Sequence, residues 1–150
     1  MSRMVLVLSG PNLAALGSRE PEIYGDQTLS DLHEQITTYG LSLGLRLDCR
    51  QSDDESQIVG WLHEAASNGT DVIFNPAAFT HYSYAVSDAC AHLVGRGSRL
   101  IEVHLSNPAA RESFRLVSVV APVATGTIAG FGSQSYLLAL DALAGTRVDR

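Results

Sequence analysis

The stretch "MVLVLSG", residues 4–10, is an uninterrupted run of apolar residues that ends in a serine and a glycine. Aliphatic runs of this length are typical of a strand that is buried on both faces of a parallel sheet. Four more segments have strand character, at residues 45–52, 71–75, 99–106 and 125–130. The first strand is therefore expected to belong to a five-stranded sheet.

Segments with helical periodicity separate these strands. After Thr28, apolar residues recur every three or four positions, and Thr28 with Asp31 predicts a capping box at the start of a helix. Ser52 and Glu55 predict a second capping box before the next helix. Two further helices are expected over residues 83–94 and 133–144.

Strands that alternate with helices indicate βαβ units and a parallel sheet covered on both faces. The pattern predicts an α/β fold, a flavodoxin-like three-layer sandwich with a five-stranded parallel sheet. A length of 150 residues suits a single domain over residues 1–150. The final segment, residues 144–150, is expected to be a polar tail.

The composition limits the classes of partner. The net charge is −6 and no basic run occurs, which argues against nucleic acid. The apolar runs are strand-length, shorter than the ~18 residues of a membrane span, and Gly10 and Pro11 interrupt any signal-peptide core. A cytoplasmic location and no membrane partner are expected.

The reactive residue types are unevenly represented. Cys49 and Cys90 lie outside any CxxC pair and are interpreted as buried thiols. All ten basic residues are arginine, and the chain contains no lysine. Schiff-base chemistry, a pyridoxal phosphate anchor and a phosphate-loop lysine are therefore excluded.

Polar residues follow several of the expected strands. Ligands of open parallel sheets bind beyond the carboxyl ends of the strands, so these side chains are expected to converge on one cleft. The loop at residues 17–25, "GSREPEIYG", follows the first strand and has the glycines and proline of a mobile connection. The expected cleft residues are Asn12, Arg19, Tyr24, Asn75, His81, Glu102, His104 and Ser106.

In the fourth strand, polar and apolar residues alternate, which places Glu102, His104 and Ser106 on one face. A buried carboxylate and imidazole are costly unless they are paired or used. Glu102 can orient His104 and favour its protonated form, which makes His104 a candidate general acid. The alternative is a hydrogen-bonded pair that serves only the packing of the sheet.

Other chemistries fit the residues less well. A metal site of His81, Glu102 and His104 has no standard ligand spacing, and a catalytic triad with Ser9 or Ser106 lacks a GxSxG turn. The loop after the first strand lacks the hydroxyl residues that a flavin phosphate needs. A receiver domain needs an aspartate where Asn75 stands, and a lysine.

Arg19 and Tyr24 suggest a role for the mobile loop. Tyrosine is a poor base at neutral pH, but a nearby guanidinium stabilises the phenolate. The two residues could form such a pair above the cleft. The alternative is that Tyr24 only anchors the loop and Arg19 is solvated, and the residue pattern alone slightly favours it.

Four blocks of the sequence, "SGPNLAALGSREPEIYG", "QSDDESQIVGWLHEA", "NPAAFTHYS" and "IEVHLSN" with the following "RESFR", occur in this order. In order and spacing they resemble the type II 3-dehydroquinate dehydratases, or type II dehydroquinases. The resemblance implies a hydro-lyase of the shikimate pathway, or of quinate catabolism, that converts 3-dehydroquinate to 3-dehydroshikimate. It also implies that neither a metal nor an organic cofactor takes part, and that the chain assembles as a homododecamer, a tetramer of trimers.

The resemblance also implies roles for single residues. Tyr24 matches the base that forms the enolate, Arg19 the arginine that activates it, and Asn12 the residue that stabilises the enolate. His104 matches the general acid and Glu102 the carboxylate that orients it. The positions that match substrate-binding residues are Asn75, His81, Asp88, Leu105, Ser106 and Arg115.

The sequence departs from the family pattern beside these positions. Pro108 and Ala109 replace an aliphatic residue and a histidine, and Ser87 stands where arginine is frequent. Pro108 lacks a backbone donor and stiffens the loop. None of these changes falls on the acid, the base or the arginine, so activity is expected to be retained. A non-catalytic protein that binds a small carboxylate is the competing interpretation.

Overall fold

The apolar run at residues 4–10 forms strand β1, Arg3–Ser9, and the last five residues of this strand are buried. The computed structural model describes residues 2–145, so residues 146–150 of the expected tail lie outside the described part of the chain. Four more strands are β2 (Leu45–Gln51), β3 (Asp71–Asn75), β4 (Leu100–His104) and β5 (Gly126–Ala129). They lie close to the ranges that the sequence predicts.

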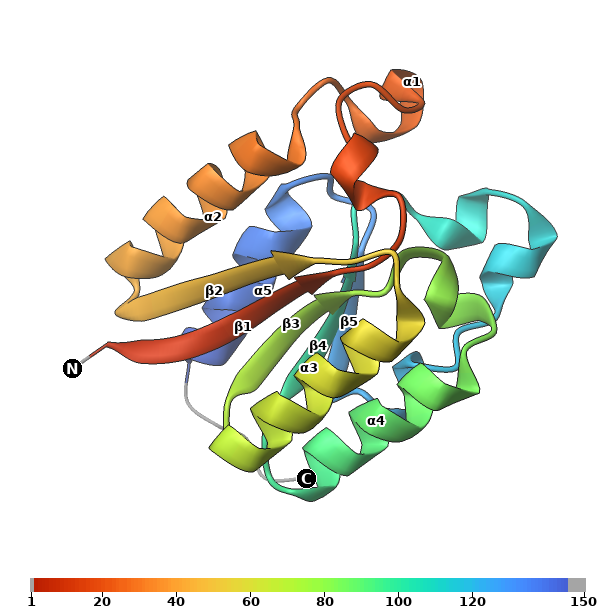
Figure 1. The fold of residues 1–150 in the computed structure, drawn as a ribbon. Coiled ribbons are helices and arrows are strands. Elements are labelled where there is room, and N and C mark those ends of the chain that lie inside the picture. Colours follow the sequence, from red (N-terminus) through yellow and green to blue (C-terminus); the bar gives the residue numbers. More distant parts are fainter. Residues whose placement is uncertain (1, 146–150) are drawn as a thin grey trace.

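The five strands form one parallel sheet in the order β2-β1-β3-β4-β5 (Figure 1). This is the flavodoxin-like order, and the predicted fold class is confirmed. The chain reverses its direction of travel across the sheet between β1 and β3, where Ser9 pairs with Asn75. A crevice is expected at that point, beyond the carboxyl ends of the two strands.

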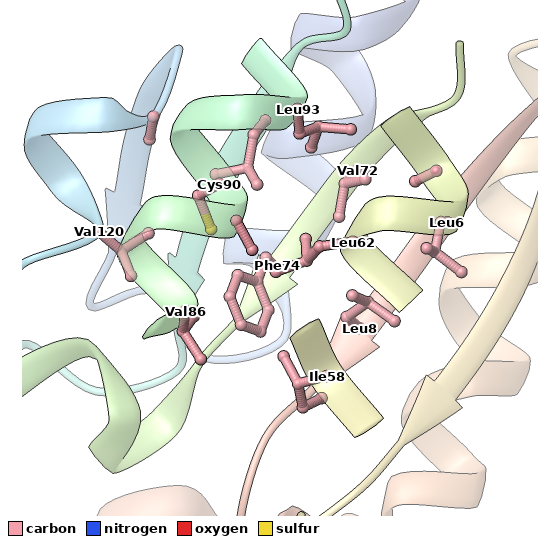
Figure 2. Close-up of a cluster of buried hydrophobic side chains, with 14 of the residues drawn as sticks. Leu6, Leu8, Ile58, Leu62, Val72, Phe74, Val86, Cys90, Leu93 and Val120 are labelled. Carbon is pink, nitrogen blue, oxygen red and sulfur yellow. The ribbon is translucent and has the colours of Figure 1, made fainter. Parts of the chain in front are cut away.

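Helices cover both faces of the sheet (Figure 1). Helices α2 (Leu29–Ser42) and α5 (Gln134–Ala144) pack on one face, and α3 (Glu55–Asn68) and α4 (Tyr84–Gly95) on the other. β1 contributes to both cores, because Leu6 and Leu8 point towards α3 and α4 while Val5 and Val7 point towards α2 and α5. Figure 2 shows the core between the sheet and helices α3 and α4, which includes Phe74. No helix within residues 2–145 is long and apolar enough to cross a membrane.

Of the two predicted capping boxes, the one at the start of α2 is present and the one at the start of α3 is not. At α2, the Thr28 hydroxyl accepts a hydrogen bond from the Asp31 backbone, and the Asp31 carboxylate accepts one from the Thr28 backbone. The second predicted box is wrong, because the N-cap of α3 is Asp54 and not Ser52. The Asp54 carboxylate accepts a hydrogen bond from the Ser56 backbone N–H. The Glu55 carboxylate instead accepts from the Ser83 hydroxyl, which joins the starts of α3 and α4.

Short helical turns occupy the connections that surround the carboxyl ends of the strands. The loop at residues 17–25 contains one turn of helix, α1 (Pro21–Tyr24), which begins at a proline and ends at Gly25. Within residues 2–145, further short 3₁₀ helices lie in the other connections. They are η1 (Leu13–Ala15), η2 (Ala77–His81), η3 (Pro108–Ala110), η4 (Ser113–Leu116) and η5 (Ala121–Val123). The last of them, η5, precedes β5 and so lies at the opposite end of the sheet.

Candidate active site

A cleft opens beyond the carboxyl ends of β1, β3 and β4, where the fold predicts a ligand site. Most of the residues that the sequence singles out line it. They are Asn12, Arg19, Tyr24, Asn75, His81, His104, Leu105, Ser106 and Arg115. Glu102 lies beneath the cleft and contacts it through His104, and Asp88 lies on the exposed side of α4, away from the cleft lining.

The turn after β1 presents Asn12 to the cleft. Gly10 passes close to β3, and its backbone N–H donates to the Asn75 carbonyl at 2.8 Å. Asn12 then has a left-handed backbone with a φ of 70°, a conformation that asparagine adopts more readily than most residues. Its backbone N–H donates to the Asp53 carboxylate at 2.9 Å. The turn is thereby fastened to the segment that follows β2.

Asn75 ends β3 and is only 3% exposed. Its side-chain oxygen accepts from the Ala77 backbone N–H at 3.1 Å, and its amide nitrogen donates to the Tyr136 hydroxyl at 3.1 Å. Burial raises the pKa of Tyr136 to about 12, so this phenol stays neutral. Two fixed partners set the orientation of the amide and leave its second hydrogen available to a ligand.

His104 and Glu102 form the pair that their alternation in β4 predicts. The His104 Nε2 lies 2.6 Å from the Glu102 Oε2, and the glutamate side chain is 2% exposed. The hydroxyls of Thr80 and Ser118 also donate to this carboxylate. Hydrogen bonds on several sides compensate the buried charge. The Nε2 of His104 is therefore hydrogen-bonded to Glu102 beneath the cleft, while His104 itself lines the cleft.

Tyr24 sits between two guanidinium groups. The Arg111 Nη1 donates to the Tyr24 hydroxyl at 2.8 Å and to the Ser106 hydroxyl at 3.2 Å. The Cζ atoms of Arg19 and Arg111 lie 5.2 Å and 5.3 Å from the centroid of the Tyr24 ring. Both guanidinium groups therefore lie at cation–π distance from the ring, and Arg111 also contacts its hydroxyl.

The remaining residues complete the wall of the cleft. The His81 Nδ1 is 2.7 Å from the Val117 carbonyl, which fixes the ring at the end of η2. The Arg115 Nε donates to the Glu112 carboxylate at 2.7 Å. With Arg19 and Arg111, Arg115 brings three guanidinium groups to a cleft in a protein of net charge −6. Glu20 and Glu112 pair with Arg111 and Arg115, but no acidic side chain of residues 2–145 lines the cleft itself, so the lining suits an anionic ligand.

The geometry also bears on the serine triad and the metal site that the sequence analysis considered. The Ser106 hydroxyl is paired with Arg111, and the imidazole Nε2 of His104 is paired with Glu102, which is not the arrangement of a serine triad. Within residues 2–145, no three His, Cys, Asp or Glu side chains are close enough together to hold a metal ion.

Sequence reasoning missed four residues that hold this site. Arg111, Tyr136, Thr80 and Ser118 contact Tyr24, Asn75 or Glu102, although they come from distant parts of the chain. Arg111 lies within the quoted block "RESFR", so a signal for it existed. Tyr136 is a buried core residue of α5, and its hydroxyl also accepts from the Asn75 side chain.

Comparison with known proteins gives one consistent result. The family model described as dehydroquinase class II matches residues 3–144. The curated 3-dehydroquinate dehydratase of Salinispora tropica is 55% identical over 140 residues, which cover 93% of this chain and 96% of that protein. That of Halalkalibacterium halodurans is 53% identical over 139 residues, with coverage of 93% and 94%.

Solved structures agree with the sequence comparisons. The type II dehydroquinase from Propionibacterium acnes superposes with a TM-score of 0.92 at 52% identity, covering 96% of this chain and 97% of that one. A 3-dehydroquinate dehydratase-like protein from Bifidobacterium longum superposes with a TM-score of 0.74 at 44% identity, covering 95% of each chain. With this fold, this cleft and a family match over nearly its whole length, the chain belongs to the class II dehydroquinase family.

Proposed function

We propose that this protein is a 3-dehydroquinate dehydratase that eliminates water from 3-dehydroquinate through an enolate, with Tyr24 as the base and His104 as the general acid. Family membership supports the overall reaction, a hydro-lyase step of the shikimate pathway. The observation that carries the mechanism is that a candidate base and a candidate acid, each with a charged partner, lie in one cleft. Tyr24 is hydrogen-bonded to the Arg111 guanidinium, and His104 is hydrogen-bonded to the buried Glu102 carboxylate.

The base half begins at Tyr24. Its phenolate takes a proton from the carbon next to the substrate ketone, and the electron pair of that C–H bond moves into the enolate. Arg111 and Arg19 support the phenolate, because a cation near an oxygen anion lowers its energy in a site of low dielectric constant. Asn12 lines the same cleft and is expected to stabilise the enolate oxygen.

The acid half belongs to His104. As the enolate collapses, the bond between carbon and the leaving hydroxyl breaks, and the hydroxyl takes a proton from the imidazolium and departs as water. Glu102 stabilises the imidazolium by its buried negative charge. The proton gained by Tyr24 then returns through solvent to His104, so the enzyme is restored without a cofactor.

Substrate binding uses the polar wall. The carboxylate of 3-dehydroquinate is expected at Leu105, Ser106 and Arg115, and the ring hydroxyls at Asn75 and His81. A planar guanidinium can hold a carboxylate by two parallel hydrogen bonds, which fixes the register of the ring between base and acid.

Asp88 does not line the cleft of its own chain, so the substrate role implied for it requires a neighbouring copy. Tyr82 and Tyr84 at the start of the same helix are exposed apolar side chains that a neighbouring copy would bury. The homododecamer implied by the family resemblance thus remains a prediction, which light scattering coupled to size-exclusion chromatography tests.

A steady-state assay of the conjugated enone product, followed in the ultraviolet, tests the proposed reaction. The wild-type chain should convert 3-dehydroquinate, and Tyr24→Phe should lower kcat by about 10²- to 10⁴-fold because the base is removed while the ring remains. Tyr39→Phe is the matched control, because the Tyr39 hydroxyl donates to Asp141 away from the cleft, and it should keep wild-type activity. Undiminished turnover by Tyr24→Phe would contradict the mechanism.

The competing function is a non-catalytic protein that binds a small carboxylate. One observation favours it, since Pro108 lines the cleft as the first residue of η3 and offers no backbone donor to a ligand. A folded wild-type chain that binds 3-dehydroquinate in calorimetry but yields no enone would establish this function instead.

A further inference from the structure

Two side-chain hydroxyls, which no pattern in the sequence predicts, form hydrogen bonds to the Glu102 carboxylate. The Thr80 Oγ1 lies 2.5 Å from the Glu102 Oε2, and the Ser118 Oγ lies 2.7 Å from the Thr80 Oγ1 and 3.2 Å from the Glu102 Oε1. Thr80 comes from η2 and is 1% exposed, while Ser118 lies between η4 and η5. Three separate segments thus meet at one buried carboxylate.

The direction of these hydrogen bonds follows from the backbone. The Ser118 Oγ accepts from the N–H groups of Val120 at 3.3 Å and Ala121 at 2.9 Å. Its lone pairs are thereby used, so its own hydrogen is donated to Thr80 or directly to Glu102. In the first case Thr80 accepts from Ser118, and in both cases the Thr80 hydrogen is free to be donated to Glu102.

An ionised Glu102 fixes the histidine in turn. A carboxylate can only accept, so the His104 Nε2 at 2.6 Å must carry a hydrogen. Nδ1 is then the nitrogen left for a ligand in the cleft that His104 lines. If Glu102 were protonated or rotated, Nε2 would lose its acceptor and the other tautomer would become accessible.

We propose that Thr80 and Ser118 are positioning residues of the dehydration, which hold Glu102 as an oriented carboxylate and so keep His104 ready to donate its proton from Nδ1. The inference rests on the proposed function. In the step itself, the hydrogen on Nε2 stays in place, the Nδ1–H bond breaks, and its proton joins the hydroxyl that leaves as water. The hydroxyl chain transfers no proton, and it acts only through Glu102.

Thr80→Val tests the proposal, because valine has the shape of threonine without its hydroxyl. We expect kcat to fall about 10- to 100-fold while KM changes less than about twofold, since the lost bond affects the acid step and not the binding of the substrate. Thr80→Ser restores the hydroxyl and should recover most of the wild-type kcat. Thr125→Val is the matched control, because the Thr125 hydroxyl accepts from the Leu100 backbone N–H away from the cleft, and its kcat should equal that of the wild type.

A second measurement does not depend on turnover. In 15N-labelled protein at a pH where His104 is neutral, two-bond nitrogen–proton spectra should show a single Nε2–H tautomer in the wild type and a mixture of tautomers in Thr80→Val. Should Thr80→Val not fold, Ser118→Ala serves for both measurements, with the same expected direction.

The outcomes separate the two proposals. An inactive wild type defeats the proposed function, whereas an active wild type that is inactivated by Tyr24→Phe leaves it standing. In that second case, a wild-type kcat and a single tautomer in Thr80→Val would overturn the positioning role. So would a low kcat that Thr80→Ser fails to recover.

Discussion

Three residues other than glycine have a positive φ angle within residues 2–145, and all three lie at or beside the cleft. They are Asn12, Glu20 and Ala77, with φ angles of 70°, 43° and 52°. A left-handed conformation costs an alanine about 1 kcal/mol or more, so neighbouring contacts must hold it. At Ala77 one such contact is the bond from its N–H to the Asn75 side chain, which also orients the ligand-facing amide.

Arg111 provides the sharpest prediction for a single residue. It donates to the Tyr24 hydroxyl, so Arg111→Ala should lower kcat by roughly 10²- to 10³-fold, the usual effect of removing one donor to a developing charge. Arg111→Lys keeps the charge and should retain part of the activity. The exposed Arg46→Ala is the control, and the enone assay is the measurement. If Arg111→Ala resembled Arg46→Ala, the phenolate would not depend on this contact.

The backbones of β1 and β3 pass close to each other where the two strands end, and the Gly10 N–H donates to the Asn75 carbonyl at 2.8 Å. A Cβ atom on Gly10 would lie 2.5 Å from the carbonyl oxygen of Pro76, which is backbone and cannot move aside cheaply. The segment that leads to Asn12 and the segment that follows Asn75 therefore lie backbone against backbone at this point. Their spacing depends on a residue without a side chain.

Gly10→Ala should separate these segments. We expect kcat/KM to fall at least 100-fold and the free energy of unfolding to drop by about 1–3 kcal/mol, measured in urea. Gly60→Ala is the matched control, because Gly60 is exposed within α3 and an added Cβ would touch nothing within 4 Å. It should be fully active and about 0.5–1 kcal/mol more stable. Equal activity of the two variants would show that this backbone contact tolerates a side chain.

At the scale of the whole molecule, the two cores contain groups that resist ionisation. Burial raises the pKa of Cys49 to about 11, and it raises those of Cys90 and Tyr136 to about 12. In the unfolded chain these groups lose their protons at lower pH. Above about pH 9 the folded state therefore binds more protons than the unfolded state, and stability falls as pH rises.

Urea unfolding at pH 8, 9 and 10 measures this effect. The free energy of unfolding should fall by about 1–2 kcal/mol per cysteine by pH 10, and the loss should be nearly complete only above pH 11–12, where the folded groups also ionise. A Cys49→Ala, Cys90→Ala double variant should show a shallower decline between pH 8 and 10. A wild-type stability that does not change over this range would refute the linkage.

The sequence predicts the elements well because each carries its own periodic signal. The run at residues 4–10 and the alternation around Glu102 and His104 are local patterns, and the structure has them as expected. Single capping residues are less predictable. Ser52, Asp54 and Glu55 are all chemically able to cap α3, and the contact of Glu55 with Ser83 helps to decide among them.

The sequence by itself determined the order of strands and helices along the chain, the absence of lysine chemistry and the candidate His104, because these depend on residue types and on spacing. Tyr24 became the candidate base only through the resemblance of its sequence block to a known family. Tertiary structure decided which groups control those candidates. Arg111 reaches Tyr24 across 87 positions, Tyr136 reaches Asn75 across 61, and Thr80 and Ser118 reach Glu102 from either side in the sequence. The physical reason is that hydrogen bonds depend on distance in space, which parallel strands with long crossovers set independently of distance in sequence.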